Sequence, residues 1–126
     1  MPPTASSCAI RVEHSPAWPV ANGYFGAVLN IFISNMGDQV VQTPWQLQLS
    51  GDVYNQVISS WNWQPAVANG IISGSGSEPW LAMQPNGEEY NIGLIVRGTS
   101  DTPADYIPTT ATLNGVVCGL QARSII

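Results

Sequence analysis

Apolar residues recur at every second position in several segments of this chain, and this period limits the fold more than any other feature. In residues 45–50 (WQLQLS), Trp45, Leu47 and Leu49 alternate with polar residues. Successive side chains of a β-strand point to opposite faces, so this segment is typical of a half-buried strand with a polar outer face. Residues 90–98 show the same alternation, and no segment carries a capped helical period long enough to predict a helix.

The remaining segments predict further strands of one β-domain. Residues 24–34 are apolar on both faces, which predicts a strand in the middle of a sheet. Ten prolines and twelve glycines interrupt the 126 residues at short intervals, as expected for many short strands joined by turns. The predicted fold class is therefore all-β, a sandwich or a barrel. Further strands are expected at residues 8–14, 57–63, 71–77 and 109–118.

The composition of the two ends suggests three regions. Residues 1–7 contain PPTASS after Met1, a Pro/Ser/Thr-rich stretch typical of a linker remnant. The folded domain is expected to span residues 8–118, and residues 119–126 are expected to form a C-terminal tail. We therefore expect a module cut from a longer secreted protein.

Charge is scarce in this chain, and that excludes several kinds of partner. Only 9% of the residues are charged, against about 25% in an average globular domain, and the net charge is −5. The cations are Arg11, Arg97 and Arg123, so no basic surface is expected for nucleic acid or for an anionic membrane. No run approaches the ~20 apolar residues of a membrane-spanning helix. Asn, Gln, Ser and Thr must cover the surface instead, which suits a neutral polar partner.

The two cysteines, Cys8 and Cys118, lie near opposite ends of the expected domain. With His14 as the single histidine, they are too few for a structural zinc site, and no CxxC motif is present. A disulfide joining the first and last strands is the favoured interpretation, and it implies an oxidising, extracellular compartment. The alternative is a pair of buried thiols in a cytosolic protein. No metal or other cofactor is expected.

The groups that could support catalysis are poorly placed. His14 follows Glu13 directly, and neighbours in a strand point to opposite faces. The adjacent acids Glu88 and Glu89 follow an Asn-Gly turn, where solvated carboxylates are common. A glycosidase needs two carboxylates facing each other across a cleft, and a GxSxG motif is absent. The sequence therefore predicts a protein that is not an enzyme.

Five tryptophans carry the strongest functional signal. Trp45 leads the alternating segment and is expected in the core with its apolar neighbours. Trp18 and Trp80 each lie between prolines in expected loops, and Trp61 and Trp63 lie two residues apart at a strand end, where both would share one face. Exposed indoles mark binding surfaces, and their flat faces stack on sugar rings. The alternative is that each indole covers a small apolar cluster under a loop.

Several features, taken in order, resemble the family 2 carbohydrate-binding modules, which occur attached to cellulases, xylanases and chitinases. The resemblance spans residues 8–118. The features are Cys8; Trp18 with Asn22-Gly23-Tyr24-Phe25; Ser34-Asn35; Trp45; Trp61-Asn62; Pro79-Trp80; Pro85 and Gly87; Pro108; Leu113-Asn114-Gly115; and Cys118.

The resemblance implies an immunoglobulin-like antiparallel β-sandwich with a disulfide joining its ends and no catalysis. Members bind polysaccharide through three coplanar surface tryptophans, and those positions match Trp18, Trp61 and Trp80. Trp45 matches the buried tryptophan of the family. Trp63 has no counterpart and would extend or replace one of the three.

Other positions depart from the family pattern. Ser59 stands where many members carry Gln, and Arg97 stands near a family Asn. In the xylan-binding branch, an arginine near the first tryptophan turns its ring upright. No arginine lies near Trp18 in the sequence, which favours the flat type that binds cellulose or chitin.

The sequence thus predicts a non-catalytic module that adsorbs to insoluble β-linked polysaccharide, crystalline cellulose first and chitin second. We expect a monomer joined by a linker to a secreted glycoside hydrolase or another secreted domain. A β-sandwich that docks a protein partner through the same tryptophans is the alternative. A small glycosidase is a third interpretation, weakened by the lack of paired acids.

Overall fold

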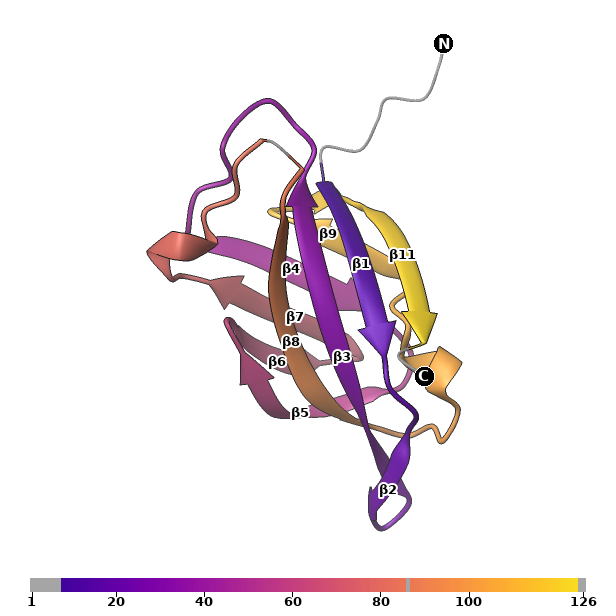
Figure 1. Cartoon of the computed structure of the whole chain (residues 1–126). Coiled ribbons are helices and arrows are strands. Elements are labelled where there is room, and N and C mark those ends of the chain that lie inside the picture. The colour runs from indigo at the N-terminus through magenta and orange to yellow at the C-terminus, as the bar shows by residue number, and fades with distance from the viewer. Residues whose placement is uncertain (1–7, 86, 125–126) are drawn as a thin grey trace.

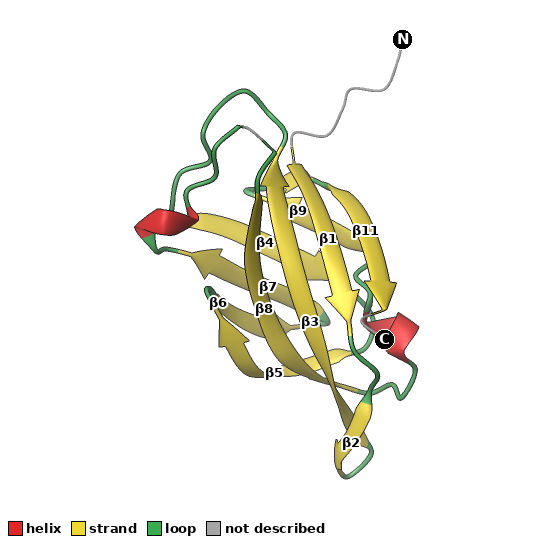
Figure 2. Cartoon of the chain, viewed as in Figure 1, coloured by secondary structure: helices red, strands yellow, loops and turns green. Residues whose placement is uncertain are grey.

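The computed structural model describes residues 8–85 and 87–124, which form a sandwich of two β-sheets (Figure 1). We call them the β3 sheet and the β4 sheet. The β3 sheet has the order β11 (Gly119–Ser124), β1 (Cys8–His14), β3 (Tyr24–Asn35), β8 (Glu89–Gly98), β5 (Tyr54–Trp61), and β2 (Trp18–Ala21) also pairs with β3. The β4 sheet has the order β10 (Val116–Val117), β9 (Thr110–Leu113), β4 (Trp45–Ser50), β7 (Ile71–Gly76), β6 (Gln64–Ala68). Two short 3₁₀ helices, η1 (Pro79–Leu81) and η2 (Pro103–Tyr106), lie between strands (Figure 2).

Residues 24–34, predicted as a strand in the middle of a sheet, form most of β3, which has a neighbouring strand on each side. β3 is hydrogen-bonded to β1 on one side and to β8 on the other. Its odd-numbered residues from Ala27 to Ile33 are fully buried, and they face the β4 sheet, whose Leu47 and Leu49 are equally buried. The core therefore fills the space between the sheets, and the even-numbered residues of β3 point outward, as the alternation of a strand requires. The all-β sandwich is thus confirmed.

The disulfide between Cys8 and Cys118 is present, and it joins residues 110 positions apart in the sequence. Both cysteines are buried, and the described residues contain no free cysteine. This excludes the alternative of two unpaired thiols. Over the same part of the chain, no group of three or more His, Cys, Asp or Glu side chains could hold a metal ion. No helix in the described ranges has the length and apolar character needed to cross a membrane.

The expected domain boundary at residue 118 is wrong, because the segment that follows Cys118 belongs to the sandwich. Gly119–Ser124 forms β11, which pairs in parallel with β1 from Ala9 to His14. The disulfide holds Cys118 beside the start of β1, so the chain continues alongside that strand, and Leu120 packs against the core. The β3 sheet is therefore antiparallel except at this edge. Residues 125 and 126 lie outside the described residues.

A buried tyrosine makes the stability of the fold sensitive to alkaline pH. The Tyr54 hydroxyl is buried and donates a hydrogen bond to the carbonyl oxygen of Tyr106 at 2.7 Å. Burial raises the pKa of Tyr54, because the phenolate would lose its hydration. The folded-state pKa lies above the unfolded value of about 10, so this stabilisation is complete below pH ~10 and is lost as the pH rises further.

We therefore expect the free energy of unfolding in urea to fall above pH ~10, and Tyr54→Phe to remove part of that fall. At pH 7, Tyr54→Phe leaves the Tyr106 carbonyl without its donor and should cost about 1–3 kcal/mol. Unfolding curves of both proteins at pH 7 and at pH 11 give the comparison. If the wild type and Tyr54→Phe lost the same free energy of unfolding between pH 7 and pH 11, the role assigned to Tyr54 would be contradicted.

Candidate functional site

The outer face of the β3 sheet carries the exposed aromatic residues that the strands position. Residues directly opposite each other in neighbouring strands point to the same face. Trp18 on β2 lies opposite Gly26 of β3, and Trp61 at the end of β5 lies opposite Gly93 of β8. Gly26 and Gly93 occupy outward positions, because Ala27 beside Gly26, and Ile92 and Leu94 beside Gly93, are buried in the core. Trp18 and Trp61 therefore share this outer face.

Each of these two indoles rests on a glycine. A Cβ atom on Gly26 would lie 2.8 Å from Cε2 of Trp18, and a Cβ atom on Gly93 would overlap the indole of Trp61. The missing side chains let both rings lie against the backbone of the sheet, the kind of close approach for which glycine is used within strands. Trp18 remains 37% exposed and Trp61 is half-buried. The Trp61 Nε1–H donates to Oδ1 of Asn91 at 3.3 Å, which fixes the orientation of the ring.

The placement of Trp61 on Gly93 yields a prediction for a small substitution. Gly93→Ala should displace the Trp61 indole and lower the free energy of unfolding by about 1–3 kcal/mol, as overpacking does. The indole N–H signals in a ¹H–¹⁵N spectrum report the displacement, with the signal of Trp45 as an internal control. Val28→Ala, on the same outer face, should leave the Trp61 signal in place. An unmoved Trp61 signal in Gly93→Ala would refute the proposed seat.

Trp63 does not share the face of Trp61, which corrects the expectation from their spacing. The predicted strand 57–63 is broken at Asn62, whose φ of 68° turns the chain, so that β5 ends at Trp61 and β6 begins at Gln64. The i,i+2 rule applies only within a continuous strand. Trp63 is 5% exposed, packs against Gly74 and donates its Nε1–H to the Gly93 carbonyl at 2.9 Å. It is a core residue without an exposed ring face for a sugar.

Trp80 is the most exposed indole, at 58%. It lies in η1, which projects at the edge of the sandwich (Figure 1). The adjacent residue Leu81 is fully buried, and its carbonyl accepts the Trp45 Nε1–H at 3.1 Å. This contact anchors the turn that presents Trp80. Trp80 lines a shallow hollow together with Asn62, Trp63, Gln64, Ser77 and Glu78, which places it beside the turn that follows Trp61.

Trp45 is fully buried, in agreement with the inward position that the alternation of residues 45–50 predicts. Its ring packs against Gly76, the residue opposite it on β7. Trp18 and Trp80 are exposed and Trp61 is half-buried; we call these three the exposed indoles below, because each of them reaches the surface. Gly93 lies opposite Asn30 of β3, and Asn30 is four residues, or about 13 Å, from Gly26 along that strand. The rings of Trp18 and Trp61 are therefore well separated.

An amide cluster beside Trp61 escaped the sequence interpretation. Asn91 Nδ2 donates to Oδ1 of Asn30 at 2.6 Å, and Asn62 Nδ2 donates to the Asn91 carbonyl at 2.9 Å. Asn30 and Asn91 occupy outward positions of two segments that were predicted as strands, so alternation places each on the surface. Their meeting depends on the register of β3 against β8, which no local pattern encodes.

Arg97 is close to Trp18 in the fold, although it is 79 residues away in the sequence. Gly26 lies between the two, opposite Trp18 on one side and opposite Arg97 on the other. The expectation that no arginine lies near Trp18 is therefore wrong in three dimensions. The Arg97 guanidinium lies over the ring of Tyr24, 4.4 Å from its centroid.

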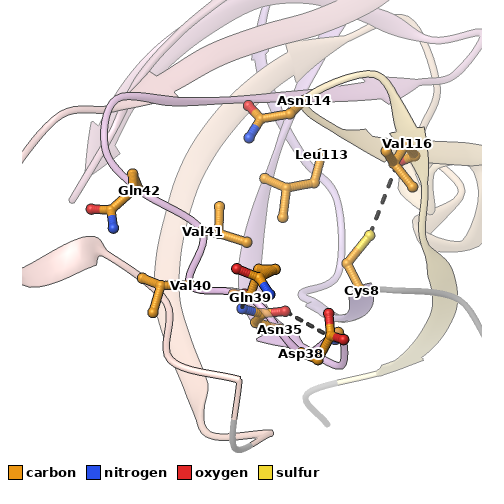
Figure 3. Close-up of a pocket in the computed structure, with 11 residues that line it drawn as sticks. Cys8, Asn35, Asp38, Gln39, Val40, Val41, Gln42, Leu113, Asn114 and Val116 are labelled. Atoms are coloured by element: carbon orange, nitrogen blue, oxygen red, sulfur yellow. Dashed lines mark hydrogen bonds between the residues drawn. The ribbon is translucent and has the colours of Figure 1, made fainter.

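A further hollow lies at the end of the sandwich where β1 begins (Figure 3). It has a volume of about 420 Å³ and is lined by Asn35, Gln39, Val41 and Leu113 among others. Asn35 Nδ2 donates to the Gln39 carbonyl at 2.6 Å and so holds the loop that forms one wall. Asp38 is the only acid among the described residues that line it. The pair of opposed carboxylates that glycoside hydrolysis needs is therefore not found in this hollow.

Comparison with solved structures shows that carbohydrate-binding domains of other proteins share the fold of this sandwich. The chitin-binding domain of a hyperthermophilic chitinase from Pyrococcus furiosus aligns with a TM-score of 0.56 and 20% identity, over 93% of this chain and 97% of that one. The chitin-binding domain of Chi18aC from Streptomyces coelicolor gives 0.53 and 14%, over 90% and 96%. The cellulose-binding family 2 carbohydrate-binding domain of ScLPMO10C gives 0.52 and 16%, over 79% and 91%.

No protein-family model matches the chain, and no curated protein sequence matches it. The likeness therefore lies in the fold, a two-sheet sandwich that this chain shares with chitin-binding and cellulose-binding domains. The resemblance to family 2 carbohydrate-binding modules, drawn from the ordered residues of the sequence, has structural support in this shared fold.

Proposed function

We propose that the protein is a non-catalytic module that binds insoluble β-linked polysaccharide by stacking the exposed indoles on sugar rings. The observation that carries the proposal is the seating of Trp18 and Trp61 on glycines of one outer face, with Trp18 exposed and Trp61 half-buried. An extended apolar patch on a surface usually marks a contact with a partner, and indoles gathered on one face are candidates for such a patch. The neutral amides of Asn30, Asn62 and Asn91 lie on the same side and supply groups that suit hydroxyls rather than charges.

The strength of such binding can be bounded. Stacking of a base on an aromatic side chain is worth roughly 1–3 kcal/mol, and stacking of a sugar is of that order or less. Three such contacts, after the costs of association, give binding in about the micromolar range. This strength suits adsorption to a surface that offers many equivalent chains. Crystalline cellulose is the first substrate that we propose, and chitin is the second.

Depletion from solution tests the proposal directly. Wild-type protein is mixed with microcrystalline cellulose, with crystalline chitin and with insoluble xylan, and the unbound fraction is measured over a range of protein concentrations. The control replaces Trp18, Trp61 and Trp80 together by alanine, with its fold verified by circular dichroism. We expect adsorption of the wild type to cellulose or chitin and none of the triple variant. Wild-type protein that stays in solution with both polysaccharides would end the proposal.

Soluble oligosaccharides separate this function from docking of a protein partner. A cello- or chito-oligosaccharide that stacks on the exposed indoles should shift their fluorescence. An unchanged spectrum would favour the protein-docking alternative.

We further propose that the module is secreted, monomeric and joined by a linker to a glycoside hydrolase or another secreted domain. The Cys8–Cys118 disulfide supports the extracellular location, because such bonds persist in oxidising compartments.

A further inference from the structure

Arg97 is held in a fixed position on the outer face of the β3 sheet. Its guanidinium stacks on the ring of Tyr24, and its Nε–H donates to Oδ1 of Asn55 at 2.8 Å. Tyr24 is an outward residue of β3, two positions before Gly26, and Gly26 lies directly opposite Arg97. The stacking and the hydrogen bond together restrain a side chain that would otherwise sample many rotamers.

The N–H groups on Nη1 and Nη2 of Arg97 are not used in these contacts. A guanidinium has five N–H groups, and Asn55 takes the one on Nε. Within the described residues, no acceptor takes a hydrogen bond from Nη1 or Nη2, and no carboxylate lies at ion-pair distance from Arg97.

Arg11 shows the contrasting arrangement on the same sheet. Its guanidinium also lies over an aromatic ring, that of Phe32, at 4.0 Å. It pairs, however, with Glu13 at 2.6 Å and with Glu89 at 2.9 Å. Arg11 is thus neutralised by two carboxylates of the protein itself, whereas Arg97 keeps its charge and its fork of donors available.

The position of Arg97 places this fork next to the exposed indoles. Trp18, Gly26, Arg97 and Gln56 form one cross-strand row over β2, β3, β8 and β5. The indole of Trp18 covers Gly26, and Arg97 lies opposite Gly26 on the neighbouring strand β8. Neighbouring strands lie about 4.8 Å apart, so Arg97 is one strand away from the residue that the indole covers. A polysaccharide chain that stacks on Trp18 would pass within reach of the guanidinium.

We propose that Arg97 is a subsite for a carboxylate borne by a sugar ring, and that the module therefore binds polysaccharide that carries uronic acid groups. A guanidinium fork matches the two oxygens of a carboxylate and can donate two parallel hydrogen bonds to it. The inference rests on the proposed stacking of sugars on the exposed indoles. It adds a charged recognition element to a surface that otherwise offers neutral amides and indoles.

The test compares cellulose nanofibrils with and without oxidation of their C6 hydroxymethyl groups to carboxylates. Arg97→Gln should weaken binding to the carboxylated fibrils about 3- to 10-fold at low salt, as expected for one exposed charge-assisted contact, and by less than about 2-fold on unmodified fibrils. The difference should shrink in 0.5 M NaCl, because salt screens the interaction. Arg11→Gln lowers the net charge equally and controls for general repulsion; it should show no such selectivity.

The outcomes separate the two proposals. Equal loss on both fibrils in Arg97→Gln would mean that the guanidinium serves neutral hydroxyls or packing, and it would overturn the carboxylate subsite. So would an Arg97→Gln variant that binds both fibrils like the wild type. Binding of the wild type to carboxylated fibrils alone, lost in Arg97→Gln, would support the subsite and reject unmodified cellulose as the substrate. Binding to neither material would overturn the carboxylate subsite and cellulose as the substrate, and the adsorption to chitin would then decide the stacking function.

Discussion

Trp61→Ala is expected to weaken adsorption to the preferred polysaccharide roughly 5- to 150-fold, the loss of one stacking contact of about 1–3 kcal/mol. Trp61 has a defined seat on Gly93 and a hydrogen bond to Asn91, so its ring is oriented before the ligand arrives. A pre-oriented ring loses little conformational entropy on binding, which is why its removal should be costly. Adsorption isotherms of the variant and of the wild type at one temperature measure the change.

Two control variants make the result specific to Trp61. Trp63→Phe alters an indole that is two residues away but buried, so it should lower the free energy of unfolding and leave adsorption near that of the wild type. Val117→Ala removes an exposed apolar residue from the β4 sheet and should change neither property. A strong loss of adsorption in Trp63→Phe, with little loss in Trp61→Ala, would reverse the assignment of the two indoles.

Removal of the disulfide is expected to lower the free energy of unfolding by about 5 kcal/mol. The bond joins residues 110 positions apart, and the entropy of closing so long a loop in the unfolded chain sets this magnitude. Both cysteines are buried, so Cys8→Ala with Cys118→Ala is a better replacement than serine, which would bury two hydroxyls. Urea unfolding of the variant and of the wild type provides the two free energies.

The reduced wild type is the matched control for that experiment. With excess reductant it should unfold at the same urea concentration as the double alanine variant, within the small effect of two sulfur atoms. A wild type that keeps its full stability under reduction, with the thiols shown to be free, would contradict the stabilising role. The loss expected here is a large part of the 5–15 kcal/mol that stabilises an average domain, so the variant should be folded only marginally.

The alternation of apolar residues was sufficient to predict the fold class and the inward position of Trp45. Side chains in a strand take sides with a period of two, and this period is a local property that a sequence displays directly. Residues 24–34 were likewise recognisable as a central strand from two apolar faces. The resemblance to a known family then placed these strands in an immunoglobulin-like sandwich.

The candidate site was harder to predict, because it depends on single backbone angles and on register. Trp61 lies on the outer face and Trp63 in the core, because Asn62 between them adopts a positive φ. Asparagine tolerates this conformation, but the spacing of the two indoles does not reveal it. Arg97 and Trp18 come into one row only through two strand pairings, which bring together residues remote in sequence. β11 was missed because residues 119–126 are too short and mixed to display a period.

The parallel pairing of β1 with β11 has a mechanical consequence. Both strands begin at the disulfide and run in the same direction, so the described chain enters at one end of the sandwich and leaves at the other (Figure 1). A pulling force applied between Cys8 and Ser124 is transmitted through the disulfide bond from Cys8 to Cys118. The 110-residue loop between the cysteines is thereby shielded from tension. The force falls on β11 alone, which is sheared along β1, and the face that carries the exposed indoles stays folded under load.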